Sequence, residues 1–321
     1  MAGAVPGLMM TRSRWHRTSV RSSLGHVGFN NPDVSWSELE RTLSDRPGSS
    51  SVGRYGKPSR ADGDGGDSPA WSYRRPDYDA PTGLVRRRGA VPYAELHCHS
   101  NFSFLDGASP PEALAEEAAR LGLEALSLTD HDGFYGVVRF AEAARATGLP
   151  TVFGAELSVG LSRPQHGVAD PEGDHLLVLA RNPSGYARLA DVISTAQLAG
   201  GEKGKPDYQG IDWSSAHGGD WLVLTGCRKG AVPRALIDEG PAAARGALGR
   251  LIDTFGRDNV AVEVWDHHDP LDSARNDALV ALAAQVGATV VATNNVHYAT
   301  PAERRLATAM AAVRARRSLE D

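Results

Sequence analysis

Seven short apolar segments alternate with Ala- and Leu-rich amphipathic segments, and this alternation limits the fold more narrowly than any other feature of the sequence. Amphipathic stretches such as residues 110–122 and 277–287 lie between most of the apolar ones. Strands that alternate with helices are typical of parallel β/α units. Seven near-continuous strands, each followed by a covering helix, favour an α/β barrel over an open sheet, although the alternation leaves closure undecided. The seven predicted strands are residues 93–100, 124–131, 151–159, 175–181, 220–227, 259–266 and 289–298.

The composition changes near residue 90. Residues 1–90 are rich in Gly, Ser, Arg, Asp and Pro and have almost no apolar periodicity. Such a segment cannot bury enough surface to offset its ordering entropy, so we expect a mostly disordered extension and linker. One short helix is predicted within it at residues 35–43, where Ser35 is the N-cap and Glu38 completes a capping box. The ordered domain is expected at residues 91–310.

The overall composition excludes several classes of protein. The 321 residues carry a formal net charge of -5, which argues against a compact nucleic-acid-binding module but not against one basic groove. The two cysteines, Cys98 and Cys227, are too few and too far apart for a disulfide framework. No apolar run approaches the roughly 18 residues of a membrane span. We therefore expect a cytoplasmic protein with no membrane partner.

The first predicted strand ends in two histidines, His97 and His99, on either side of Cys98. Side chains alternate faces along a strand, so the two imidazoles project together while Cys98 points into the core. Two imidazoles on one face can clamp a metal ion. An isolated pair of this kind is nonetheless more often a pair of surface histidines, so the pattern gains weight only from the other strands.

Polar residues recur at the ends of the other strands. Glu156 lies inside an apolar run, and a buried carboxylate must be paired or ligating. His175 begins its strand instead of ending it, so the strand pattern alone does not place it with the others. Taken singly, Cys227 would be a small buried hydrophobe and His175 a strand-edge histidine. The remaining candidates are Asp106, His131, Asn295 and His297.

Taken together, the polar residues at the strand ends are better explained by metal binding than by separate structural roles. Six of the seven strands place a His, Cys, Asp, Glu or Asn at or near one end. Five histidines, two carboxylates and one thiol exceed the four ligands of a tetrahedral zinc. The set therefore predicts two or three metals that share ligands, an arrangement suited to phosphoester hydrolysis.

At these positions the sequence resembles the polymerase-and-histidinol-phosphatase (PHP) family. The resemblance rests on four motifs, residues 97–99, 129–132, 154–157 and 295–297, and covers about residues 92–310. It implies a distorted seven-stranded (β/α)7 TIM-like barrel and a cluster of two or three divalent ions, zinc or manganese. The implied ligands, which now include His175, are His97, His99, Asp106, His131, Glu156, His175, Cys227, Asn295 and His297. The implied catalytic residues are His97, His99, His131, Glu156 and His297.

Within this family, the chain is similar to the domain that opens bacterial C-family polymerases, relatives of the DNA polymerase III alpha subunit. The similarity is carried by residues 175–194, and residues 28–44 resemble the opening of the error-prone branch. This implies DNA-directed DNA polymerase function in damage-induced mutagenesis and translesion synthesis, with DNA and proteins such as the sliding clamp as partners. Nothing here resembles palm, thumb or fingers. We therefore expect a fragment, in which residues 311–321 begin the connection to a missing polymerase region.

One departure from the family pattern bears on activity. The polymerase pattern has aspartate at position 295, where this chain has Asn295. An amide oxygen binds a dication more weakly than a carboxylate, so phosphoesterase or 3′–5′ exonuclease activity is expected to be weakened. Three hypotheses stay open: a polymerase PHP domain with a proofreading-type or vestigial metal site, a free phosphatase for a small phosphate monoester, and a catalytically inactive structural PHP module.

Overall fold

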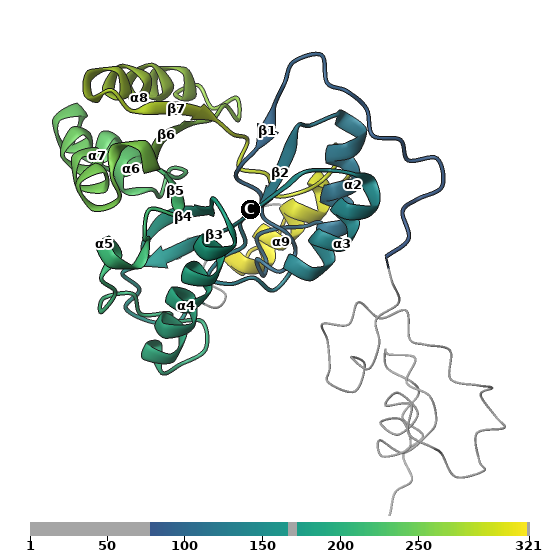
Figure 1. Ribbon diagram of the computed structural model, residues 1–321, viewed down its shortest axis with the longest axis horizontal. Helices are drawn as coiled ribbons and strands as arrows, with labels where there is room; N and C mark the ends of the chain where they lie inside the picture. The colour runs from purple at the N-terminus through teal and green to yellow at the C-terminus, as the bar shows by residue number, and fades with distance from the viewer. Residues whose placement is uncertain (1–77, 166–171, 320–321) are drawn as a thin grey trace, which may run out of the picture. The chain divides into compact units, whose positions relative to one another are not determined.

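The computed structural model describes residues 78–165 and 172–319, which fold into a curled seven-stranded sheet with helices around its outside (Figure 1). The short helix predicted at residues 35–43 lies outside the described residues. In chain order the elements are β1 (Ala94–Glu95), α2 (Pro111–Leu121), β2 (Ala125–Leu128), α3 (Val137–Thr147), β3 (Thr151–Val159), β4 (Asp174–Ala180), α4 (Pro183–Gly200), α5 (Trp213–Ala216), β5 (Trp221–Leu224), α6 (Ala231–Asp238), α7 (Pro241–Phe255), η2 (Arg257–Asn259), β6 (Val260–Val264), α8 (Asp272–Val286), β7 (Thr289–Ala292), η3 (Pro301–Glu303) and α9 (Arg304–Ala315).

The strands lie side by side in the order in which they occur in the sequence. Neighbouring strands pair in parallel from β1 to β3 and again from β5 to β7. Figure 1 shows α2 and α3 beside β1 and β2, α4 beside β3 and β4, and α6 to α8 beside the last three strands. The predicted α/β class and the seven strands are therefore confirmed.

The orientation of β4 differs from the prediction of uniformly parallel strands. β4 pairs antiparallel with both neighbours, with Glu156 of β3 opposite Leu177 and Ser158 opposite His175. The described part of the connection between β3 and β4 contains no helix, and an antiparallel pair needs no helical crossover. The beginning of β4 consequently lies at the same end of the sheet as the carboxyl ends of the other strands.

A single bridge joins the two outer strands of the sheet. Cys98, just past β1, pairs in parallel with Val296, just past β7. Its two hydrogen bonds run from His99 N to Val296 O (2.8 Å) and from Val296 N to His97 O (2.8 Å). This bridge brings the ends of β1 and β7 together in the segment that carries the candidate ligands.

The helices around the sheet begin and end at residues suited to those positions. α2 has Pro111 in its first turn and ends at Gly122, whose left-handed φ of 78° suits glycine. In α4, Pro183 follows the N-cap Asn182, whose side chain accepts a hydrogen bond from Gly185 N. None of the helices within residues 78–165 and 172–319 is both long and apolar enough to cross a membrane.

Alternate residues of each strand pack on opposite sides of the sheet. Leu177 and Leu179 of β4 pack with Leu224 and Ala261 in one cluster, whereas Val178 belongs to the larger cluster formed with the helices. Since Glu156 stands directly opposite Leu177, its carboxylate emerges on the same face as that smaller cluster. The candidate ligands thus lie above an apolar floor inside the curled sheet.

Packing against the domain begins upstream of residue 91, where the ordered domain was expected to start. The Tyr78 hydroxyl donates to Glu116 of α2, and Arg86 donates to the carbonyl oxygen of Gly148 (2.7 Å). The backbone N–H of Arg87 donates to Ala119 O (2.9 Å). Residues 78–89 therefore lie against α2 and the end of α3.

From the packing of the core we expect two substitutions to have very different effects on the free energy of unfolding. Trp221 is fully buried in the largest cluster, and its ring N–H donates to Gly185 O (2.8 Å). We expect Trp221→Ala to lower the free energy of unfolding by about 3–5 kcal/mol, because it leaves a cavity and an unpaired carbonyl. Leu198→Ala, at a side chain that is 83% exposed, should change it by less than about 0.5 kcal/mol. Equal urea midpoints for the two variants would contradict this account of the core.

Candidate metal centre

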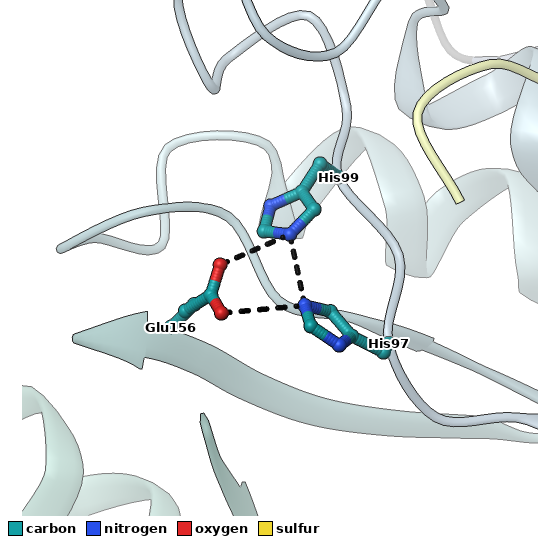
Figure 2. A group of neighbouring side chains, drawn as sticks. All are labelled: His97, His99 and Glu156. Atoms are coloured by element: carbon teal, nitrogen blue, oxygen red, sulfur yellow. Dashed lines mark hydrogen bonds and ion pairs between the residues drawn. The ribbon is translucent and has the colours of Figure 1, made fainter. Parts of the chain in front are cut away.

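The first group of candidate ligands consists of His97, His99 and Glu156, all buried (Figure 2). The Nε2 atoms of the two histidines are 3.0 Å apart. Glu156 directs one carboxylate oxygen to each: Oε1 is 3.5 Å from His97 Nε2 and Oε2 is 3.3 Å from His99 Nε2. The two imidazoles therefore share one face beyond β1, and Cys98 between them is buried in the apolar core with α2 and α3, as the strand alternation predicted.

The second group is centred on Asp106, which follows the first strand in a loop. Its Oδ2 atom is 3.3 Å from His131 Nε2 and 3.2 Å from His297 Nε2. Its other oxygen accepts a hydrogen bond from Arg314 of α9 at 2.6 Å. Burial opposes ionisation, but the hydrogen bonds from His131 and His297 hold the pKa of Asp106 well below its usual range. Arg314 thus fixes one oxygen of Asp106 while the other faces two imidazoles.

The third group joins β3 to the beginning of β4. His175 Nδ1 is 3.0 Å from Glu156 Oε1, and His131 Nδ1 is 3.6 Å from Glu156 Oε2. Cys227, which follows β5, places its sulfur 3.6 Å from His175 Nδ1. Burial and the charge of Glu156 raise the pKa of this thiol well above its usual range. Because β4 is antiparallel, His175 reaches the cluster from the first residues of its strand, which the strand pattern had left unexplained.

Asn295 completes the set with an unusual backbone and an unpaired oxygen. Its φ of 45° lies in the left-handed region, which asparagine and aspartate tolerate better than other side chains. Its Oδ1 atom is buried and has no hydrogen-bond partner within residues 78–165 and 172–319. A buried acceptor without a partner is costly, and a cation beside it would satisfy it.

These groups border a cavity of about 870 Å³. Its wall includes eight of the nine sequence-predicted ligands, and the ninth, His97, lies directly beneath it against Glu156 and His99. The structure therefore brings all nine side chains to one place. The rim also carries cationic side chains and two further histidines: Arg228, Lys229, Arg275, Arg314, His267 and His268.

Burial and neighbouring charges shift the pKa values of the cluster in opposite directions. Burial acts to lower the pKa of His97, but Glu263 and Glu156 hold it well above its usual range. Burial lowers the pKa of His99 to about 3. Burial opposes ionisation of Glu156, yet His175 and His97 hold its pKa well below the usual range. The cluster thus keeps a buried carboxylate charged among imidazoles, as a divalent-ion site requires of a carboxylate ligand.

Glu263 of β6 also belongs to the site, although it was not among the candidates predicted from the sequence. Its Oε1 atom is 2.8 Å from His97 Nδ1, so it orients the imidazole with Nε2 toward Glu156. Such carboxylate–histidine pairs fix the ring and raise its basicity toward a metal. The signal was available, because Glu263 interrupts the apolar run of its strand as Glu156 does in β3.

Glu95 was also missed, although it too interrupts an apolar segment. Its Oε1 atom accepts a hydrogen bond from His97 N (2.8 Å), and Oε2 accepts one from Asn294 N (2.9 Å). It therefore links the backbone beyond β1 to the backbone beyond β7, next to the bridge that joins these strands. Glu95 positions the histidine segment without facing the cavity.

The spacing of the ligand atoms fits divalent ions. In a tetrahedral zinc site with zinc–nitrogen distances of about 2.1 Å, neighbouring ligand atoms are about 3.4 Å apart. The Nε2 atoms of His97 and His99 are 3.0 Å apart, and each lies 3.5 or 3.3 Å from a different oxygen of Glu156. Together with the unpaired oxygen of Asn295, these separations fit the binding of a divalent ion by these side chains.

A sequence comparison agrees with this fold and side-chain set. The PHP domain family matches residues 95–267, more than half of the chain. The chain belongs to the PHP domain family.

Curated relatives extend the similarity to nearly the whole chain. The error-prone DNA polymerase of Mycolicibacterium paratuberculosis (strain ATCC BAA-968 / K-10) is 54% identical over 294 residues, and that of Nocardia farcinica (strain IFM 10152) is 48% identical over 336 residues. Each alignment covers 92% of this chain but only 26% and 29% of the respective relative. The chain thus spans about a quarter of the length of the curated relatives that it matches.

Solved structures are more distant. The metal-dependent phosphoesterase from Bifidobacterium adolescentis aligns at 19% identity with a TM-score of 0.38, over 67% of this chain and 91% of that chain. An amidohydrolase from Chromobacterium violaceum aligns at 20% identity with a TM-score of 0.42, over 65% of this chain and 88% of that chain. Similarity at this level supports no argument about the site.

The contact between Glu263 and His97 predicts an effect on metal affinity. Glu263→Gln preserves the shape of the side chain but removes the charge beside His97 Nδ1. We expect a 10- to 100-fold weaker affinity for zinc or manganese, measured by competition with a chelator of known affinity. Glu239→Gln, at an exposed carboxylate beyond α6, is the control and should bind metal as the unmodified chain does. If both variants bind equally, Glu263 has no role in orienting His97.

Proposed function

We propose that this chain is the PHP domain of an error-prone DNA polymerase and that its cavity holds two or three divalent ions, zinc or manganese. One observation carries the proposal: three sets of ligand atoms, each within 4.8 Å of one another, share members pairwise. His99 belongs to the first and second sets, His131 to the second and third, and Glu156 to the first and third. Shared ligands of this kind suit neighbouring ions. The proposed ligands are His97, His99, Asp106, His131, Glu156, His175, Cys227, Asn295 and His297.

The reaction that this arrangement supports best is hydrolysis of a phosphodiester at a DNA 3′ end. Paired divalent ions supply a hydroxide at neutral pH and stabilise the attacking and leaving oxygens. The side chains hold the cluster in place: Glu263 orients His97, and Arg314 orients Asp106. The residues proposed to be essential for catalysis, through metal binding, are His97, His99, His131, Glu156 and His297.

The setting of this activity is proposed from the relatives. Because the relatives are named error-prone DNA polymerases, we infer that the whole protein acts on DNA in damage-induced mutagenesis and translesion synthesis in the cytoplasm. The sliding clamp and other replication or translesion proteins are the partners that we expect for it. A free phosphatase for small monoesters and a purely structural barrel are the alternatives that the following experiment separates.

The proposal predicts manganese-dependent release of nucleotides from a 3′-labelled single-stranded oligonucleotide. His131→Ala should reduce the rate at least about 100-fold, because His131 contributes to two of the three sets of ligand atoms. That variant, purified in parallel, also excludes a contaminating nuclease. Hydrolysis of small monoesters without hydrolysis of DNA would favour the phosphatase. Absence of both activities in a metal-loaded chain would favour the structural role.

A second prediction concerns Asn295. Asn295→Asp adds a carboxylate at a buried, unpartnered position, and aspartate tolerates the same left-handed backbone. If the amide is what weakens the cluster, the substitution should raise the metal occupancy towards three ions per chain and should raise the cleavage rate by about 10-fold or more. The double variant Asn295→Asp/His131→Ala is the control and should lose the gain. No increase in either quantity would show that Asn295 does not limit the site.

A further inference from the structure

Phe104 is a large aromatic side chain that is left exposed at the cavity. It is 77% exposed and lies on the cavity wall together with Asp106. Phe102, two residues earlier in the same loop, is only partly exposed and lies under the guanidinium of Arg139 at 5.9 Å. The loop therefore covers one aromatic ring with the protein and presents the other at the opening of the site.

The backbone on both sides of Phe104 is held in place. Ser103 N donates to Ser100 O (2.9 Å), and Asp106 N donates to Ser103 O (2.9 Å). Buried Asp130 accepts hydrogen bonds from Ser100 N and from the Ser103 hydroxyl, both at 2.7 Å. These bonds tie the loop to the end of β2, so that the position of Phe104 is set by the fold.

The residue after Phe104 has a strained backbone. Leu105 has a φ of 60°, in the left-handed region that disfavours leucine. Strain of this kind persists where the surrounding structure enforces it, and it is found preferentially at ligand sites. Here the left-handed turn lets the chain present Phe104 outward and then return Asp106 to His131 and His297.

The wall of the cavity combines the exposed ring of Phe104 with cationic side chains, beside several carboxylates. Arg228, Lys229 and Arg275 border this cavity, where Arg275 also pairs with Asp272 (3.4 Å) and Asp269 (3.7 Å). Single-stranded nucleic acid is bound by this combination, in which cations meet the phosphates and aromatic rings stack on the bases. The cavity of about 870 Å³ lies near the upper end of the roughly 300–1,000 Å³ range of ligand pockets, so it has room for more than a phosphate group.

We propose that Phe104 stacks on the terminal base of a single-stranded DNA 3′ end and so positions the last phosphodiester at the metal centre. This inference rests on the proposed function of the site. Every base offers an aromatic face, so the contact selects unpaired nucleic acid over small phosphate esters without selecting a sequence.

The test is a steady-state comparison of substrates with and without a terminal base. On a single-stranded oligonucleotide, Phe104→Ala should raise KM about 10-fold with little change in kcat. Phe104→Trp, which keeps an aromatic face, should restore KM. An oligonucleotide that lacks only its terminal base should show the same KM with the unmodified chain and with Phe104→Ala. Tyr135→Ala, at an aromatic side chain that is 63% exposed and outside the cavity wall, is the matched control and should leave KM unchanged.

The oligonucleotide that lacks its terminal base also separates this inference from the proposed function. Phe104→Ala should hydrolyse it as the unmodified chain does. An equal loss on this substrate would mean that the substitution disturbs the centre itself, which overturns the stacking role. Unchanged KM on DNA would also overturn it and would fit a protein partner over Phe104. If the unmodified chain hydrolyses neither substrate, the proposed function fails and this inference fails with it.

Discussion

The buried carboxylate of Glu156 is the interaction on which the rest of the site depends. Only 1% of this residue is exposed, and an unpaired carboxylate at such a place would cost several kcal/mol. Four imidazoles surround it within 3.6 Å, from His97, His99, His131 and His175. They come from three segments of the chain, those that follow β1 and β2 and the beginning of β4, so the carboxylate is compensated only where the curled sheet brings these segments together. The stability of the fold and the arrangement of the site therefore both depend on the buried carboxylate of Glu156.

The antiparallel direction of β4 brings the fourth imidazole, that of His175, to Glu156. In a uniformly parallel barrel, the first residue of a strand lies at the end opposite the catalytic rim. β4 runs antiparallel, which puts His175 at the rim, 3.0 Å from Glu156. At the other side of the sheet, the bridge between Cys98 and Val296 brings the segments beyond β1 and β7 together. The antiparallel β4 and the bridge between the segments beyond β1 and β7 thus bring together ligands that lie far apart in the sequence.

The sequence predicted the class of fold, the seven strands and most of the side chains that meet at the cavity, because strand period and polar strand ends are local patterns. His175 was expected there only from the resemblance to the PHP family. It did not predict the direction of β4, since an apolar run reads the same in either orientation. Glu263 was overlooked although it interrupts its strand as visibly as Glu156 does. Arg314 could not be foreseen, because its contact with Asp106 spans 208 residues and depends on where α9 lies. Patterns within a single segment could thus be predicted from the sequence, whereas strand direction and contacts between distant segments could not.

The most direct test of the account is to locate the ions. Crystals of the chain loaded with zinc or manganese would give anomalous difference maps at the absorption edge of each metal. The account predicts two or three peaks within the cavity, one of them about 2.1 Å from the Nε2 atoms of His97 and His99 and bound by Glu156. A metal-loaded crystal with no peak among these three side chains would contradict it.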